Sequence, residues 1–200
     1  MAGNRRVNDR VESQQRGRSV VERVEQQLRS AQCVQNPTTG ALLSPIVSAS
    51  DNQVTFYTWL PQSSTDISTP LMRQITFDPT AKTLTQKTWS GWTTPPDPAT
   101  APPDSPNGTV TLLDNVTATP AGNPFFAYYA SDATTPLSTA GMTTAQRDSI
   151  VRVALGMAVG PKVAAGSSPD TYVTFADDVT VRLPPNYSQG TATGGPLCVP

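Results

Sequence analysis

The N-terminal segment of this chain differs in kind from the rest, and it constrains the fold more than any other feature. From Asn4 to Gln32 there is no proline and a single glycine, Gly17, while Glu, Gln, Arg and Val dominate. Apolar residues recur there at spacings of three, four or seven, which predicts an amphipathic helix. Polar residues interrupt this pattern across 13–19. We therefore predict that the later half packs on a globular body and that the earlier half projects from it or frays.

The dipeptide Asn36-Pro37 ends the predicted helix, because a residue before proline avoids the helical region and proline cannot continue the ladder. Two hundred residues suffice for one domain with a real core. We expect an N-terminal stalk helix over 1–35, a β-rich globular head over 36–183 and a C-terminal tail over 184–200. Within the helix, Val21, Val24 and Leu28 are expected to hold it against a sheet.

Beyond residue 37 the pattern changes to short runs rich in β-branched and aromatic residues, which predict strands. The polar link Asp78–Lys82, which contains a proline, predicts a hairpin between two of these strands. The segment Ser90–Thr109 holds six prolines and almost no aliphatic residue, so we predict an exposed loop. The expected strands are Ile46–Ser50, Gln53–Leu60, Leu71–Phe77, Thr83–Trp89, Thr109–Leu113, Phe125–Tyr129, Ile150–Met157, Tyr172–Phe175 and Val179–Leu183.

The composition excludes several function classes. The chain has no histidine, which removes the commonest general base and the commonest metal ligand. It also lacks the glycine-rich phosphate and dinucleotide motifs and the nucleophile elbow. The net charge of −1 provides no general field for nucleic acid. We expect no enzyme activity, no cofactor, no metal and no nucleic-acid partner.

Asp177 and Asp178 are the strongest catalytic candidates, because a glycosidase can work with two carboxylates alone. Neighbouring side chains on a strand point to opposite faces, so the two carboxylates would diverge. The favoured interpretation is a solvated turn before the strand that follows. A calcium site is the other interpretation, but the chain has no run of acids to supply its oxygen ligands.

The two cysteines, Cys33 and Cys198, lie too far apart for a metal or redox motif. They are either two buried thiols or a disulfide from the end of the helix to the C-terminus. The composition suggests export, where thiols oxidise, and a bridge would stabilise the fold by roughly 4–5 kcal/mol. Of the tryptophans, Trp59 and Trp89 sit in strand patterns and are expected in the core. Trp92 follows a glycine in a polar loop and is the candidate partner contact.

An ordered series of segments resembles the minor type IV pilins and the minor pseudopilins of type II secretion or competence systems. The resemblance covers Asn4 to Leu183. It starts with the helix SVVERVEQQLRSAQCV and the strand region SPIVSASDNQVTFYTWL, and it continues through RQITFDPTAKTLTQKTW, LLDNVTATPAGNPFFAYYASD, RDSIVRVALGMAV and VTFADDVTVRL.

The resemblance implies an α+β, pilin-like fold in which the amphipathic stalk helix packs on an antiparallel β-sheet head. It implies a filament subunit at the tip or at initiation, whose partners are other pilin or pseudopilin subunits and, in the full-length form, the inner-membrane assembly machinery. It further implies an extracytoplasmic location at the cell surface or in the periplasm. The chain would be an ectodomain without the membrane half of its stalk helix.

Three other interpretations stay open from the residues. The first is a secreted adhesive or ligand-binding β-sandwich with a helical extension, which two stacked sheets without helix contact would favour. The second is the carboxylate-dependent glycosidase, ranked last. The third is a viral attachment protein.

Overall fold

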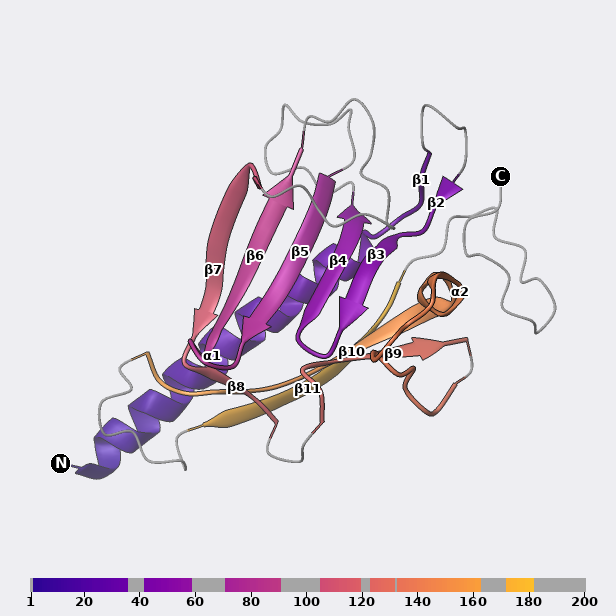
Figure 1. Cartoon of the computed structure of the whole chain (residues 1–200). Helices are drawn as coiled ribbons and strands as arrows, with labels where there is room; N and C mark the ends of the chain where they lie inside the picture. Colours follow the sequence, from indigo (N-terminus) through magenta and orange to yellow (C-terminus); the bar gives the residue numbers. More distant parts are fainter. Residues whose placement is uncertain are drawn as a thin grey trace.

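Two antiparallel sheets and a long N-terminal helix enclose the hydrophobic core (Figure 1). The computed structural model describes residues 2–35, 42–58, 71–90, 105–119, 123–131, 133–162 and 172–181. Helix α1 spans Ala2–Arg29, which confirms an N-terminal helix but not its predicted end at Asn36-Pro37, because strand β1 already occupies Val34–Gln35. The short helix α2 spans Thr144–Asp148. A two-stranded pair, β1 (Val34–Gln35) and β2 (Leu42–Leu43), follows α1.

The first sheet is a meander in which each strand pairs with the next along the chain. Asp78 shapes the turn after its third strand, because its Oδ1 accepts the backbone N–H groups of Thr80 at 2.8 Å and Ala81 at 2.9 Å. The predicted Asp78–Lys82 hairpin is confirmed. The five strands are β3 (Ile46–Ser50), β4 (Gln53–Thr58), β5 (Leu71–Asp78), β6 (Thr83–Trp89) and β7 (Gly108–Asp114).

The second sheet is built around its longest strand, β10. This strand pairs with β11 on one side, and with β9 and then β8 on the other. Its members are β8 (Val116–Ala118), β9 (Phe126–Ala130), β10 (Ile150–Val159) and β11 (Val173–Thr180).

The expected turn at Asp177 and Asp178 is absent, so that prediction is wrong. Both residues lie inside β11, opposite Leu155 and Ala154 of β10. The physical reason is that the long β10 strand offers an uninterrupted row of backbone partners. Ladder hydrogen bonds continue through the two aspartates despite their low intrinsic strand preference.

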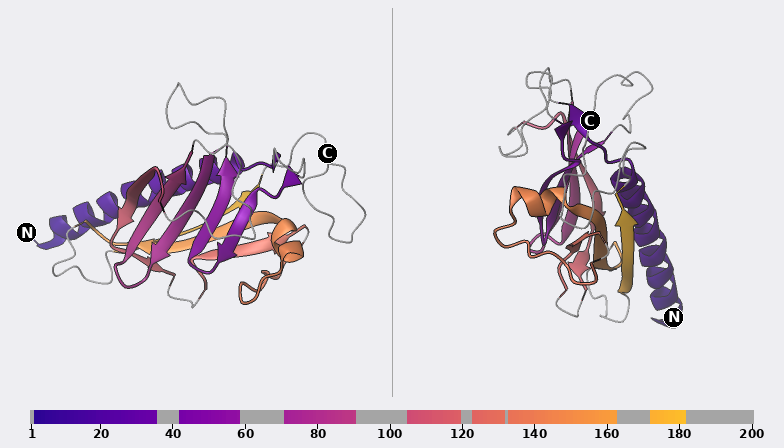
Figure 2. Two further views of the ribbon diagram at one scale, coloured as in Figure 1. Left: turned by 45° about the horizontal axis from the view of Figure 1, so that its top comes forward. Right: turned by 90° about the vertical axis from the view of Figure 1, so that its right-hand side faces the viewer.

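The predicted α+β, pilin-like fold, a stalk helix packed on one antiparallel head sheet, is also wrong. Of the residues that the structure describes, 48% lie in antiparallel strands and 22% in helices. The predicted strands divide between two sheets, because β8 to β11 pair among themselves and add nothing to the meander. Helix α1 makes its most extensive contact with β11, at the edge of the second sheet (Figure 2, right).

The core lies between the inner faces of the two sheets and α1. The rings of Phe77 and Phe125 stack across it with centroids 4.4 Å apart. A smaller cluster on the opposite face of the first sheet contains Trp89, which is 4% exposed and confirms the expected burial of that residue. Trp59 lies outside the described residues.

Candidate functional site

One face of α1 is anchored to the body from Ser13 onward. The residues on this face recur at three- and four-residue spacings, as expected for a helix packed along one side. Val21, Val24 and Leu28, which the sequence pattern selected for packing, are 6%, 1% and 0% exposed and lie in the core cluster with residues of both sheets. The anchored face of α1 consists of Ser13, Arg16, Gly17, Val20, Val21, Val24, Gln27 and Leu28.

The polar stretch that interrupts the sequence pattern belongs to this anchored face. Ser13 is fully buried and its hydroxyl donates to the carbonyl of Asp9 at 2.8 Å. Gly17 is buried against Phe175 of β11, whose ring occupies the space that a side chain at position 17 would need. Small residues therefore let the helix approach the strand closely in the part of α1 that has no large apolar residues.

Arg16 fastens the same part of the helix to the far end of the two sheets. Its guanidinium forms an ion pair with the Asp114 carboxylate and donates to the Asp114 carbonyl at 3.1 Å. It also donates to the carbonyl of Gly160, just beyond β10, at 3.3 Å. A single side chain thus connects α1 to the ends of β7 and β10.

Glu25 of α1 and Asp177 of β11 form a carboxyl pair at the helix–strand contact. The hydrogen bond with Asp177 raises the pKa of Glu25, and burial and the Asp177 charge raise it further. Arg29 opposes this rise, because its guanidinium lies 3.5 Å from the Glu25 carboxylate. The neighbouring Asp177 carboxyl group thus favours the protonated form of Glu25, since two ionised carboxylates at this place would repel each other.

The first turns of α1 extend beyond the sheets (Figures 1 and 2). Val7 is 62% exposed there and Val11 is 47% exposed. At 100° per residue, the two valines lie roughly 120° and 160° around the helix from Ser13. Val7 lies only about 40° around the helix from Val21 of the anchored face, so the two valines form an exposed apolar pair on the projecting turns, next to that face.

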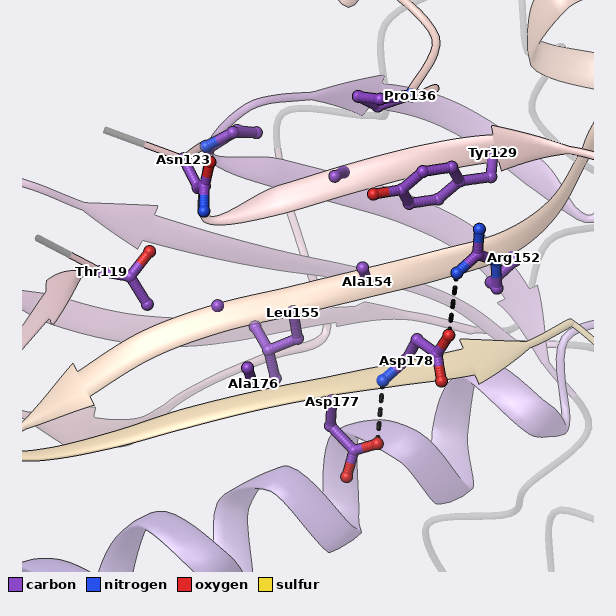
Figure 3. Close-up of a pocket in the computed structure, with 13 residues that line it drawn as sticks. Thr119, Asn123, Tyr129, Pro136, Arg152, Ala154, Leu155, Ala176, Asp177 and Asp178 are labelled. Atoms are coloured by element: carbon purple, nitrogen blue, oxygen red, sulfur yellow. Dashed lines mark hydrogen bonds and ion pairs between the residues drawn. The ribbon is translucent and has the colours of Figure 1, made fainter. Parts of the chain in front are cut away.

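The outer face of the second sheet carries a groove of about 550 Å³ (Figure 3). Its floor is made of small residues from three adjacent strands, namely Ala127, Ala154, Gly156 and Ala176. Tyr129, Arg152 and Asp178 stand at one end of this floor. The alternation in β10 that places Arg152, Ala154 and Gly156 on one face is visible in the sequence, although nothing in that local pattern marks these residues as a site.

The two adjacent aspartates have different partners. The Asp178 carboxylate accepts from Arg152 at 2.9 Å, while Asp177 meets Glu25 and its Oδ1 accepts the backbone N–H of Asp178 at 2.8 Å. They therefore diverge as expected for neighbours on a strand. In the described segments no cluster of three or more metal-ligating side chains occurs.

Two other predicted site residues fall outside the described part of the chain. These residues are Trp92 and Cys198. Most of the loop Ser90–Thr109 and all of the tail 184–200 also lie outside the described residues. Cys33 is disulfide-bonded. Of the helices in the described residues, none is both long and apolar enough to cross a membrane.

No known protein family model matches this chain, and a search of curated proteins finds no match either.

Proposed function

We propose that this protein is a non-enzymatic structural subunit of an extracytoplasmic filament, of the minor pilin or pseudopilin class, and that α1 joins it to neighbouring subunits. One observation carries the proposal: α1 is a single helix whose later part is anchored and whose first turns extend outward with Val7 and Val11 exposed. An exposed apolar pair on the projecting turns of a helix is suited to packing against a helix of another subunit.

Two further observations support this assignment. The sequence of α1 and of the segments after it resembles pilin-type subunits, although the fold differs from the pilin-like one expected from that resemblance. The disulfide at Cys33 is consistent with an oxidising, extracytoplasmic compartment. On this proposal, the partners are other subunits of the same filament and the membrane machinery that assembles it.

The test is a pair of matched double variants expressed in the cell that makes the protein. Val7→Asp/Val11→Asp places two charges on the apolar pair, and Asn8→Asp/Gln15→Asp places the same charges at exposed polar positions of the same helix. Valine and aspartate have similar helix propensities, so the helix itself is retained. We expect the first variant to lower the amount of protein in the sheared surface-filament fraction about tenfold and the second to leave it within about twofold.

Two results would overturn the proposal. One is wild-type protein that never enters a high-molecular-weight surface fraction. The other is equal incorporation of the Val7→Asp/Val11→Asp variant and the wild type, with unchanged thermal stability in both.

A further inference from the structure

The groove on the outer face of the second sheet has the size and shape of a small-molecule site. Its volume of about 550 Å³ falls within the roughly 300–1,000 Å³ range of such sites. The floor is low because Ala154, Gly156 and Ala176 carry little or no side chain, whereas Tyr129 and Pro136 rise beside it (Figure 3). Strand pairing in β9, β10 and β11 makes this floor rigid.

Arg152 orders the polar end of the groove through contacts with three other residues. The Arg152 guanidinium carbon lies 3.9 Å from the centre of the Tyr129 ring. Arg152 also donates to the Asp178 carboxylate at 2.9 Å and to the Ala133 carbonyl at 3.1 Å. These contacts orient a guanidinium, a carboxylate and a phenol together, so a ligand meets a preorganised set of donors and acceptors.

The opposite end of the groove adds neutral hydrogen-bonding groups. Asn123 and Thr119 both line that end (Figure 3). The Thr119 hydroxyl oxygen is buried and has no hydrogen-bond partner among the described residues. Because a buried hydroxyl without a partner is costly, a bound hydroxyl group that supplies the bond would be favoured.

The chemistry of the lining restricts the ligand. The Arg152 guanidinium is already paired with the Asp178 carboxylate, which disfavours phosphate, sulfate and other anions. A peptide that adds a strand has no place on this floor, since β10 already pairs on both sides. The remaining combination of aromatic ring, small apolar floor, carboxylate, amide and hydroxyl suits a molecule with many hydroxyl groups and apolar C–H faces.

We propose that this groove binds a neutral saccharide. The carboxylate accepts hydrogen bonds from sugar hydroxyls, and the amide both accepts and donates them. The C–H face of a sugar ring lies on the alanine and glycine floor. This binding is a separate property from filament assembly through α1, because the groove and the Val7–Val11 pair share no residue.

The experiment uses the intact chain and three neutral probes, namely cellotetraose, maltotetraose and chitotetraose, with a sulfated oligosaccharide as the anionic counter-probe. Binding is followed by NMR chemical-shift changes up to about 10 mM probe. We expect at least one neutral probe to shift the amide signals of Ala154, Gly156 and Ala176 in a saturable manner. The sulfated probe is expected to bind at least about tenfold more weakly.

A pair of leucine variants locates the binding. Ala176→Leu fills the floor from an exposed position of β11, and Thr174→Leu adds a leucine two residues earlier on the same face, outside the groove. The first is expected to weaken binding at least about tenfold, and the second to change it by less than about twofold. Both variants should melt within a few degrees of the wild type.

The proposal is overturned if no neutral probe shifts the groove signals, if the sulfated probe binds more tightly than the neutral ones, or if Ala176→Leu binds like the wild type. The Val7→Asp/Val11→Asp variant separates this proposal from the assembly role, since it is expected to bind the saccharide with wild-type affinity. Loss of saccharide binding in that variant would contradict the independence of the two sites.

Discussion

The ring of Phe175 in β11 occupies the space beside Gly17 of α1 in which any side chain at position 17 would have to lie. A Cβ atom built on Gly17 would be 2.2 Å from Cε2 of Phe175 and 2.4 Å from its Cζ. Carbon atoms in contact lie at about 3.5–4.0 Å. The most extensive contact of α1 with the rest of the protein therefore includes a position that admits only glycine without movement of the ring.

Gly17→Ala is expected to lower the free energy of unfolding by about 1–2 kcal/mol, because overpacking against Phe175 outweighs the better helix propensity of alanine. In a Phe175→Ala background the same substitution should instead raise stability by about 0.5–1 kcal/mol, since only the propensity gain remains. Urea unfolding of the two single variants and the double variant measures the change of sign. A stabilising Gly17→Ala in the wild-type background would contradict the close contact.

Glu25→Gln is expected to remove a pH dependence of stability. The pKa of Glu25 is raised above its usual value of 4.5, first by the hydrogen bond with Asp177, so the native state holds a proton that the unfolded state releases. The stabilisation is complete below pH 4.5 and is lost as the pH rises through the raised pKa. Glutamine retains a donor toward Asp177 at all pH values.

The difference in free energy of unfolding between Glu25→Gln and the wild type should therefore be about 0.5 kcal/mol more favourable to the variant at pH 8 than at pH 4.5. Urea unfolding at both pH values measures it. Glu12→Gln is the matched control, because Glu12 is exposed on the same helix and does not contribute to the raised pKa of Glu25. A control variant with the same pH dependence as Glu25→Gln would argue against the carboxyl pair.

Arg16→Met is expected to cost about 1–3 kcal/mol, because it leaves the Asp114 carboxylate and two carbonyl groups without their donor. Arg18→Met should cost less than about 0.5 kcal/mol, since the Arg18 side chain is 75% exposed. Hydrogen exchange adds a regional measurement: amides of α1 around residue 16 should lose protection in Arg16→Met. Equal effects of the two substitutions would contradict the role of Arg16 in holding α1 to the ends of β7 and β10.

Tyr128→Phe is expected to lower stability by about 1–2 kcal/mol. The Tyr128 hydroxyl lies 3.0 Å from the Ser50 carbonyl and 2.7 Å from the Gln53 carbonyl, so it ties β9 to the β3–β4 turn of the other sheet. Burial raises the pKa of Tyr128 well above that of an ordinary tyrosine. Spectrophotometric titration should accordingly show this phenol ionising only as the protein unfolds.

The control for this prediction is Tyr129→Phe, on the outward side of the same strand, which should change stability by less than about 0.5 kcal/mol. A Tyr128→Phe variant as stable as the wild type would show that the hydroxyl does not hold the two sheets together.

Reduction of the Cys33 disulfide is expected to lower the stability by about 2–5 kcal/mol, because a cross-link restricts the unfolded chain. The melting temperature with and without reductant measures the effect, and Cys33→Ser should reproduce the reduced value. An unchanged melting temperature in a sample shown to be fully reduced would contradict the prediction.

The candidate sites were only partly accessible from the sequence. Val21, Val24 and Leu28 could be selected because large apolar residues at helical spacing have a strong local signal. Ser13, Arg16 and Gly17 gave no such signal, although they continue the same face. Arg16 faces inward because it bonds to Asp114, which lies 98 residues further along the chain. No local sequence pattern carries that information.

The groove shows the same division. The alternation of Arg152, Ala154 and Gly156 places them on one face of any strand. Tyr129 and Asp178 join them only through the pairing registers Arg152↔Tyr129 and Ala154↔Asp178. Register depends on the packing of both faces of the sheet, which the sequence of one strand does not specify.

By itself, the sequence determined the helical N-terminal segment, the Asp78–Lys82 hairpin and most of the strands, because these follow from spacing and turn chemistry within a few residues. Only the tertiary structure decided that the strands form two sheets, that Asp177 and Asp178 stay inside β11, and that Gly17 is a contact residue. Those outcomes depend on pairing and packing between segments far apart in the chain. Such contacts stabilise the fold only when both segments are in place.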